Sequence, residues 1–309
     1  MKTLILFFSF CLISMAIFAQ NQANLSLNLK QDNVYRIKST SVTSMVQTIM
    51  DRQQNSETKT FSIISLKPTS FDGNLINAEL KFDSIGFTNS MPQMDVSSAK
   101  PGQLSSTDLN ATMNLILYRL TKSIIKVQLS GDGKVVAFSN LKSVSDSVLA
   151  GLDTLKGQMA GMFLNQAKNL INESTLRGNI EINTAHLPGK TVQVGEKWTS
   201  QTKISYNGIG IIITGNYKLK KITGNKAEIK ADVTNEPANS DPIDMGGAQI
   251  TYDARGLGEV DLIVDTTTGW VLKSSSKSHS QGNIQVKAQG QEFQMPVEID
   301  ITEERVALP

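Results

Sequence analysis

The sequence predicts a mainly β (α+β) fold, with antiparallel sheets in two similar units and one long and one short helix packed on their apolar faces. Successive side chains of a strand point to opposite faces, so apolar–polar alternation marks strands with one dry and one wet face, as in antiparallel sheets. Turns rich in Gly, Asn and Asp separate these strands. Stretches rich in Pro, Gly or Ser predict loops at 88–106 and 234–247. The alternation is clearest at 76–83, 226–233, 259–264 and 297–301.

Two stretches have helical spacing instead. The short helix is expected at about 107–120, where apolar residues recur every three or four positions and Ser106 or Thr107 can cap the first turn. The long helix is expected at 141–171, either continuous or interrupted at Gly161, because glycine costs a helix about 1 kcal/mol relative to alanine. Its apolar stripe needs a partner, and the dry faces of the sheets are available.

The two halves of the chain begin alike. Residues 28–38 pass from a polar turn to Tyr35 at the head of a strand rich in Ser and Thr, and residues 194–199 do the same with Trp198. In both halves a hairpin around a Gly–Asn pair follows, and then an alternating strand that ends in an Asp/Gly turn. The matches indicate an internal duplication, although any two antiparallel sheets share such turns.

Four segments follow from these observations. We expect a signal peptide at 1–19 and a first β-rich unit at 20–138. A helical connector at 139–186 then leads to a second β-rich unit at 187–309.

The N-terminal segment has the pattern of a secretory signal peptide. Lys2 gives a positive start, residues 3–18 are almost wholly apolar, and polar residues follow Ala19, so cleavage is expected after Ala19. The alternative is a membrane anchor, but the apolar run is short for a span and no basic cluster follows it. Acylation of Cys11 is disfavoured because the apolar run continues beyond it. We therefore expect a periplasmic or secreted protein.

Composition narrows the classes of function. Cys11 is the only cysteine, so the mature chain is expected to rely on core burial rather than disulfides. Thiolate zinc sites, haem attachment and cysteine nucleophiles are thereby excluded. Without Lys2, the 30 basic residues become 29, against 28 acidic ones, and no basic cluster stands out. Nucleic acid is therefore not an expected partner.

Two motifs carry a resemblance to a family. Residues 187–198, LPGKTVQVGEKW, resemble the L-P-x-K-x-V-x-V-G-[DE]-x-W segment of an uncharacterised family of secreted Bacteroidota proteins, a domain of unknown function. Residues 256–269, GLGEVDLIVDTTTG, are similar to a later strand-turn-strand of the same family. The resemblance covers essentially the whole mature chain. It implies an exported, β-rich protein and supplies no activity, cofactor or site residue.

Residues for catalysis are scarce. The two histidines, His186 and His279, have no second histidine at metal-ligand spacing, and we expect each to lie in a loop or on the surface. The acidic residues between 241 and 265 fit the wet face of a strand better than a calcium loop. We therefore expect no enzymatic activity, no cofactor and no metal. The competing interpretation is a hydrolase of envelope polymers that uses carboxylates.

The apolar strand faces suggest a binding function. A sheet that curls over a helix can leave an apolar groove, and burying an acyl chain contributes roughly 0.8 kcal/mol per CH₂. We expect Met159, Met162 and Phe163 to line such a groove, because Met side chains adapt to irregular ligands. The hypothesis is an envelope protein that binds a lipid or other apolar ligand. The alternative is a structural or protein-interaction module whose helix fills the groove.

Overall fold

The computed structural model describes residues 21–49, 52–91, 93–156, 160–206, 209–239, 241–245, 248–288 and 290–309. The expected signal peptide at 1–19 lies outside these described residues.

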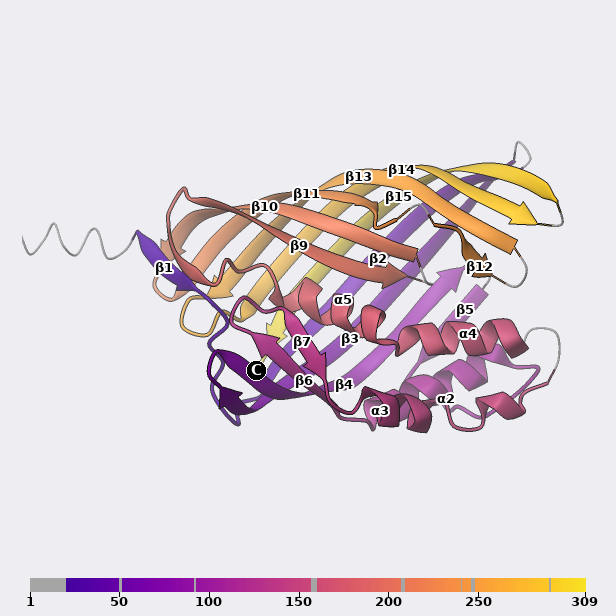
Figure 1. Ribbon diagram of the computed structural model, residues 1–309, viewed down its shortest axis with the longest axis horizontal. Coiled ribbons are helices and arrows are strands. Elements are labelled where there is room, and N and C mark those ends of the chain that lie inside the picture. Colours follow the sequence, from indigo (N-terminus) through magenta and orange to yellow (C-terminus); the bar gives the residue numbers. More distant parts are fainter. Residues whose placement is uncertain are drawn as a thin grey trace, which may run out of the picture.

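A single sheet of 13 strands dominates the molecule (Figure 1), and every described pairing in it is antiparallel. The predicted mainly β, antiparallel class is therefore confirmed. The order is β7-β6-β4-β3-β2-β15-β14-β13-β11-β10-β9, with β5 beside β4 and β12 beside β13. These strands are β2 (Tyr35–Ile49), β3 (Arg52–Asp72), β4 (Leu75–Ser90), β5 (Gln93–Ser97), β6 (Ile125–Ser130), β7 (Val135–Phe138), β9 (Lys197–Tyr206), β10 (Ile209–Thr223), β11 (Lys226–Pro237), β12 (Ile243–Met245), β13 (Ala248–Asp265), β14 (Val271–Ala288) and β15 (Gln291–Leu308).

The first and last long strands join the two halves of the chain. β2 pairs with β15 from Gln47 opposite Val297 to Arg36 opposite Leu308. Strands from both sequence halves therefore belong to one continuous sheet. A separate two-stranded sheet, β1 (Gln22–Leu25) with β8 (Lys190–Gln193), lies at one end of it.

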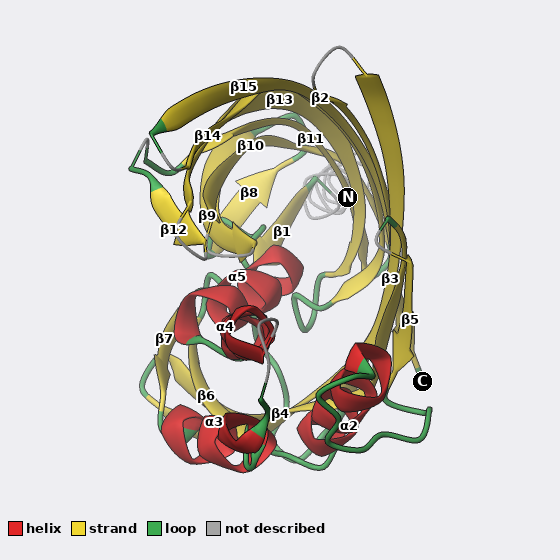
Figure 2. Cartoon of the chain, turned by 90° about the vertical axis from the view of Figure 1, so that its right-hand side faces the viewer, coloured by secondary structure: helices red, strands yellow, loops and turns green. Residues whose placement is uncertain are grey.

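The large sheet curls, which gives it a concave inner face and a convex outer face (Figure 2). Glycines on β13 and β14 accommodate the close approach of these two strands. A Cβ at Gly256 would collide with the Ser280 side chain, and one at Gly282 would collide with the backbone of Asp253. Glycine within a strand marks such bends, because it leaves room for the neighbouring backbone.

The two edge strands, β7 and β9, are bridged by a helix instead of pairing with each other. Helix α5 (Glu173–Thr184) lies between them in Figure 2. On the β7 side, the Glu181 carboxylate accepts a hydrogen bond from the Val135 backbone N–H at 3.0 Å. On the β9 side, the Ser200 hydroxyl donates to the Ala185 carbonyl at 2.7 Å. The large sheet is thus an open sheet whose edges are linked through α5.

The helical connector differs from the predicted helix at 141–171, whether continuous or interrupted at Gly161. It contains α3 (Leu141–Val148), a short 3₁₀ turn at Leu152–Thr154, α4 (Ala160–Leu170) and α5. The expected interruption at Gly161 is wrong, because Gly161 lies inside α4. The chain instead leaves the helical path at Gly151, whose φ of 80° is a left-handed conformation that favours glycine. No helix in the described ranges is long and apolar enough to cross a membrane.

The short helix is α2 (Leu109–Thr121), so the predicted helix at about 107–120 is confirmed to within two residues. Its cap is Asp108, not Ser106 or Thr107, and the Asp108 carboxylate accepts from the Ala111 N–H at 2.9 Å. The two predicted loops are wrong in part: β4 and β5 enter the range 88–106, and β11 and β12 enter the range 234–247.

The hydrophobic core fills one end of the inner face, which we call the proximal half. Here Ile37, Leu219, Ile229 and Leu262 are each at most 2% exposed. The segment around β1 supplies part of the filling, because Leu25, Leu27 and Leu29 belong to the same cluster. Both tryptophans, Trp198 and Trp270, are buried in it.

Candidate functional site

The other end of the inner face carries a second apolar surface. Residues directly opposite each other on antiparallel strands share a face, so the strand register places these side chains together. Ile299 lies opposite Met45 on β2, and Tyr252 lies opposite Ile284 on β14. We call this surface the distal patch; its residues are Met45, Ile250, Tyr252, Ile284, Val286, Ile299 and Ile301.

The seven side chains of the distal patch are half-buried, although they face the concave side of the sheet, and the inward-facing Ala254 and Val297 that lie among them are buried at 3% and 2% exposure. Inward-facing apolar side chains in a filled interior lose nearly all their exposure, as Leu262 and Ile229 do in the proximal half. The core cluster of the described residues does not include the distal patch. Next to it on β15, Phe293 is 39% exposed. Solvent therefore reaches an apolar concave surface that the described side chains leave uncovered.

A buried ion pair on β15 lies between the proximal half and the distal patch. The Arg305 residue is 4% exposed. Its Nε donates to Glu303 Oε1 at 2.9 Å, and its Nη2 contacts Glu303 Oε2. Its Nη1 donates to the Ile182 carbonyl of α5 at 3.0 Å. Each guanidinium nitrogen is thus occupied by protein oxygens, and the pair fixes the last turn of α5 to the sheet.

The buried imidazole of His186 lies beside this pair. Sequence reasoning placed His186 in a loop or on the surface; it does lie in a turn after α5, but it is only 6% exposed. Its Nδ1 is 3.3 Å from the Tyr217 hydroxyl, and its Nε2 has no hydrogen-bond partner among the described residues. Tertiary packing buries a residue that the local pattern would leave in water.

Burial sets the protonation of this cluster. It lowers the pKa of His186 to about 3, and the charges of Arg305 and Lys134 act in the same direction, while a backbone hydrogen bond with Ile182 opposes them. Burial raises the pKa of Tyr217 to about 12, and the charge of Arg305 opposes this rise. Both side chains are therefore neutral near pH 7. A general acid or base works best with a pKa near the operating pH, which neither group has.

Hydroxyl side chains border the ion pair on its two neighbouring strands. Ser39 on β2 and Ser274 on β14 both lie opposite Arg305. Ser41 and Ser276 lie opposite Glu303 in the same way. The Ser39 hydroxyl is buried without a hydrogen-bond partner in the described part of the chain. Small, neutral hydrogen-bonding groups therefore flank the ion pair on both neighbouring strands, and Ile301 of the distal patch is the next inward residue after Glu303 on β15.

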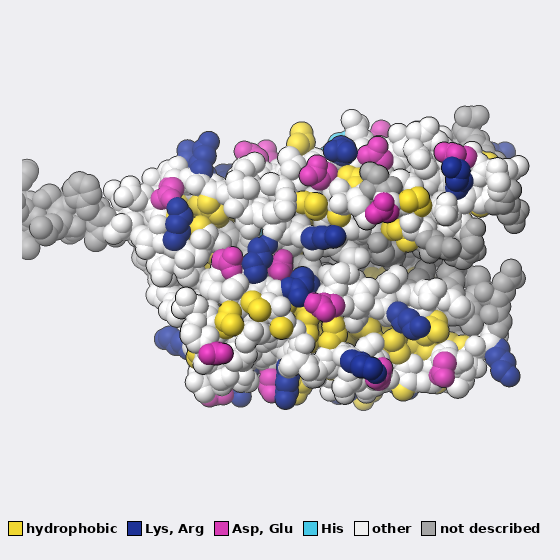
Figure 3. Space-filling view, viewed as in Figure 1, with side chains coloured by type: hydrophobic (Ala, Val, Ile, Leu, Met, Phe, Trp, Pro, Cys, Tyr) yellow, Lys and Arg dark blue, Asp and Glu magenta, His cyan; other side chains and the backbone are white. Residues whose placement is uncertain are grey.

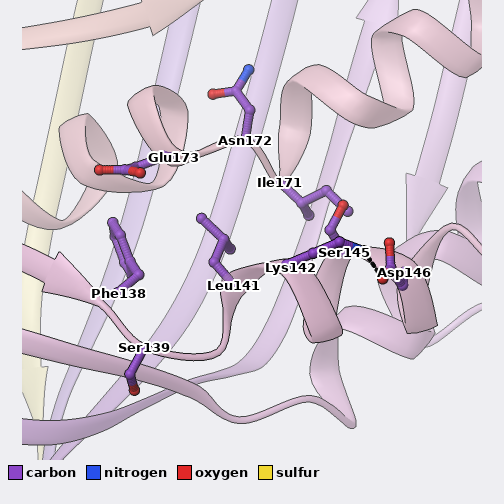
Figure 4. Close-up of a pocket in the computed structure, with 9 residues that line it drawn as sticks. All are labelled: Phe138, Ser139, Leu141, Lys142, Ser145, Asp146, Ile171, Asn172 and Glu173. Carbon is purple, nitrogen blue, oxygen red and sulfur yellow. Dashed lines mark hydrogen bonds and ion pairs between the residues drawn. The ribbon is translucent and has the colours of Figure 1, made fainter.

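A pocket of about 490 Å³ opens where β7, α3 and the α4–α5 junction meet (Figure 4). Lys142 and Asp146 at its rim form an ion pair at 2.6 Å, and the Glu173 carboxylate pairs with Arg177 at 2.7 Å. The acidic side chains are open to solvent, at 65% exposure for Asp146 and 60% for Glu173. Such solvated, paired groups do not form a preorganised catalytic centre. The remaining lining residues are Phe138, Ser139, Leu141, Ser145, Ile171 and Asn172.

The predicted groove-lining residues cannot be placed against the distal patch. Met159 lies outside the described residues. Met162 and Phe163 belong to α4, but their side chains lie outside the description. His279, the other histidine singled out in the sequence, is exposed on the outer face, with its Nδ1 2.9 Å from Asp300.

The ion pair was missed in the sequence, although a signal for it exists. On β15, Val297, Ile299 and Ile301 follow one another on the inner face. Continuing the period of two places Glu303 and Arg305 at the next two inward positions. A carboxylate and a guanidinium two residues apart on a dry strand face indicate a buried pair.

The outer face is polar and carries charges of both signs. Figure 3 shows the side of the molecule seen in Figure 1, which includes α3, α4 and α5 besides outer strands, and there Lys and Arg are interspersed with Asp and Glu and with hydrophobic side chains. Ion pairs such as Lys230 with Asp261, at 2.9 Å, connect the neighbouring strands β11 and β13 on the outer face. Within the described residues, no three His, Cys, Asp or Glu side chains come together in a group that could hold a metal ion.

Comparison with known proteins finds no curated protein that matches the sequence. Among solved structures, lipovitellin, studied for lipid–protein interactions, aligns with 9% identity and a TM-score of 0.43 over 91% of this chain. The match covers 25% of the lipovitellin chain, so this protein spans about a quarter of its length. At this TM-score the likeness carries no argument about function.

Two outer-membrane proteins also align. A channel from Pseudomonas putida F1 has 6% identity and a TM-score of 0.24, over 91% of this chain and 97% of its own. OmpF of Salmonella typhi, in complex with daunomycin, has 8% identity and a TM-score of 0.24, over 92% of this chain and 100% of its own. These likenesses likewise carry no argument about function.

A comparison with models of protein families does find a match to the sequence. The model of a family of unknown function, DUF6263, matches residues 73–271, which is well over half of the 309-residue chain. Both motifs that carried the resemblance, at 187–198 and 256–269, lie within this match. The protein therefore belongs to the DUF6263 family of unknown function.

Proposed function

We propose that the protein binds a lipid or another apolar ligand on the distal patch. One observation carries the proposal: the seven inward-facing apolar side chains of the distal patch stay half-buried outside the core cluster, while Leu262 and Ile229 in the proximal half are at most 2% exposed. Contiguous exposed apolar patches on soluble proteins mark binding sites. A ligand would complete the burial that the described side chains leave incomplete.

The chemistry of the surface fits an acyl chain. Each CH₂ removed from water contributes roughly 0.8 kcal/mol, so a chain of a dozen carbons can gain most of the free energy of a micromolar complex from burial alone. Burial raises the pKa of Tyr252 in the distal patch. This low-dielectric surrounding suits an apolar guest.

We propose binding without catalysis. Among the described residues, the two least exposed carboxylates that pair with cations are Glu181 and Glu303, at 8% and 20% side-chain exposure. Glu303 is bound by Arg305, and Glu181 is bound by Lys134 at 3.5 Å and by the Val135 N–H. These contacts favour a role for both carboxylates in packing α5. They favour it over the alternative role, catalysis in a hydrolase of envelope polymers.

The test of the function is native mass spectrometry on protein purified without detergent, followed by solvent extraction. We expect an apolar molecule to leave with the organic phase, and the melting temperature to rise when it is added back. If the protein is instead a structural or protein-interaction module of the envelope, no lipid would be extracted from it and added lipid would not raise the melting temperature.

We further propose that the protein is exported to the periplasm or beyond. The support is the charged start, apolar run and small residue of 1–19, together with a fold whose described residues contain no cysteine. N-terminal sequencing of the expressed protein tests this. A chain that begins near Gln20 is the expected result, and a retained Met1 would contradict it.

We also propose that the chain arose by duplication, with units at 20–138 and 187–309 joined by the segment 139–186. The support is that each part contributes a run of consecutive antiparallel strands to the sheet. The hairpins β3–β4 and β10–β11 also turn through glycines with the same φ of 57°, Gly73 and Gly224. Significant similarity between the two halves within a family alignment would test the proposal.

A further inference from the structure

We infer that the ligand of the distal patch is an uncharged lipid with a neutral hydrogen-bonding group, such as an ester or a hydroxyl. The inference rests on the proposed function and concerns the chemistry of the ligand. It starts from the distribution of charge on the inner face.

Charged side chains are rare on this face of the described strands. Following the register across the large sheet, the inward positions carry Arg305 and Glu303, which neutralise each other. The one further charged inward position is Arg52, which is exposed at the tip of the β2–β3 hairpin. The outer face of the same strands is, by contrast, rich in Lys, Asp and Glu.

The Arg305 guanidinium is not free to receive an anion. Two of its nitrogens contact the Glu303 carboxylate, and the third donates to the Ile182 carbonyl. A carboxylate or phosphate that reached this point would meet the negative charge of Glu303. An anion in an apolar groove without a free cation loses its hydration with no compensation.

Neutral hydrogen-bonding groups lie beside the ion pair and beside the adjoining end of the distal patch. Ser276 on β14 lies opposite Glu303, while Ser278 on β14 and Thr43 on β2 lie opposite Ile301 of the distal patch, and all three are half-buried. Hydroxyls both donate and accept, so they can bind an ester carbonyl or an alcohol. The arrangement therefore suits a ligand whose polar end is uncharged and whose chain lies over the distal patch.

The test compares two ligands with the same acyl chain, 1-oleoylglycerol and oleate, with the full-length mature protein at pH 8. Both are measured by competition with one fluorescent acylglycerol probe, below the concentrations at which they aggregate. We expect 1-oleoylglycerol to bind at least tenfold more tightly than oleate. Equal binding, or tighter binding of oleate, overturns the inference but leaves the proposed function standing. Binding of neither lipid overturns both.

A pair of variants tests the cause. Glu303→Gln keeps the hydrogen-bonding shape but leaves the Arg305 charge uncompensated, so oleate should bind about tenfold more tightly while 1-oleoylglycerol is unchanged. Glu304→Gln removes a carboxylate from the outer face of the same strand and should leave both affinities unchanged. The same gain in both variants would overturn the role of the inner ion pair. Should Glu303→Gln fail to fold, the wild-type comparison of the two lipids still decides the inference.

Discussion

The two ends of the inner face differ in what covers them, although the same strands build both. Along β13, Leu262 in the proximal half is 2% exposed and packed in the core, whereas Ile250 in the distal patch is half-buried and outside the core cluster. The β1 segment, Trp198 and Trp270 fill the proximal end. The described residues provide no such filling over the distal patch.

The difference shows that alternation alone does not tell a core face from a binding face. Both ends have dry inward positions, and only the segments that fold against them decide whether those positions are buried by the chain itself. The Arg305–Glu303 pair lies at the transition. Substitutions on either side of it should therefore affect different properties.

The largest effect is expected from truncating one core side chain. Leu262→Ala should lower the free energy of unfolding by about 2–5 kcal/mol, because it leaves a cavity in a packed core. Ile250→Ala, on the same strand and face, should cost roughly 1 kcal/mol or less, because its side chain is only half-buried and lies outside the core cluster. Urea unfolding of the ligand-free protein measures both. Similar losses in the two variants would contradict the division of the inner face.

The curvature of the sheet can be tested at Gly256. Gly256→Ala places a methyl group against the Ser280 side chain and the His279 carbonyl, and should destabilise the protein by about 1–3 kcal/mol. Gly131→Ala is the matched control, since a Cβ there meets no atom within 4 Å. Thermal unfolding compares the two. An unchanged Gly256→Ala protein would show that β13 and β14 do not need their close approach.

The buried imidazole of His186 should make the free energy of unfolding depend on pH. The pKa of His186 is lowered to about 3 in the folded state, against 6.5 in the unfolded chain, so the unfolded state binds the extra proton between these values. Stability is therefore lost as the pH falls below 6.5, at up to about 1.4 kcal/mol per pH unit from this group.

Unfolding of wild type and of His186→Gln between pH 7 and 5 measures this contribution. The variant should show a shallower dependence, by close to one proton. His279→Gln serves as control, because His279 is exposed on the outer face. A wild-type slope that His186→Gln leaves unchanged would mean that the imidazole is not buried in its neutral form.

The smallest expected effect lies in the distal patch and concerns binding. Ile299→Ala removes part of the apolar surface and should weaken 1-oleoylglycerol binding about three- to tenfold, which corresponds to roughly 1 kcal/mol. Val306→Ala, on the outer face of the same strand, should leave the affinity unchanged. Competition with the fluorescent acylglycerol probe measures both; equal affinities in the two variants would place the ligand elsewhere.

Local patterns in the sequence predicted much of the fold. The alternation at 226–233, 259–264 and 297–301 lies within β11, β13 and β15, and the helical spacing at 107–120 became α2. Each of these signals depends only on residues that are neighbours in the chain. Side-chain periodicity indicates which face of a strand is apolar. It is a reliable signal because that face is covered either by the rest of the chain or by a ligand.

The rest depended on contacts between distant residues. The pairing of β2 with β15 joins the two ends of the chain, and no local pattern encodes it. The break at Gly151 was missed because the apolar spacing of the predicted helix continues through it in the sequence. Helix α5 lies beyond residue 171, where that predicted helix ended. His186 is buried only because α5 brings it against Tyr217, and Arg305 is buried only because Glu303 and α5 surround it.

Photolabelling tests the central claim, that the chain fills the proximal half and a ligand covers the distal patch, most directly. The probe is an acylglycerol with a diazirine on its chain, irradiated with the mature protein and mapped by peptide mass spectrometry. We predict labels on the peptides around Met45, Ile250, Ile284 and Ile299, and their loss when unlabelled 1-oleoylglycerol competes. Labels confined to outer-face or proximal residues, or labels that competition does not reduce, would contradict the account.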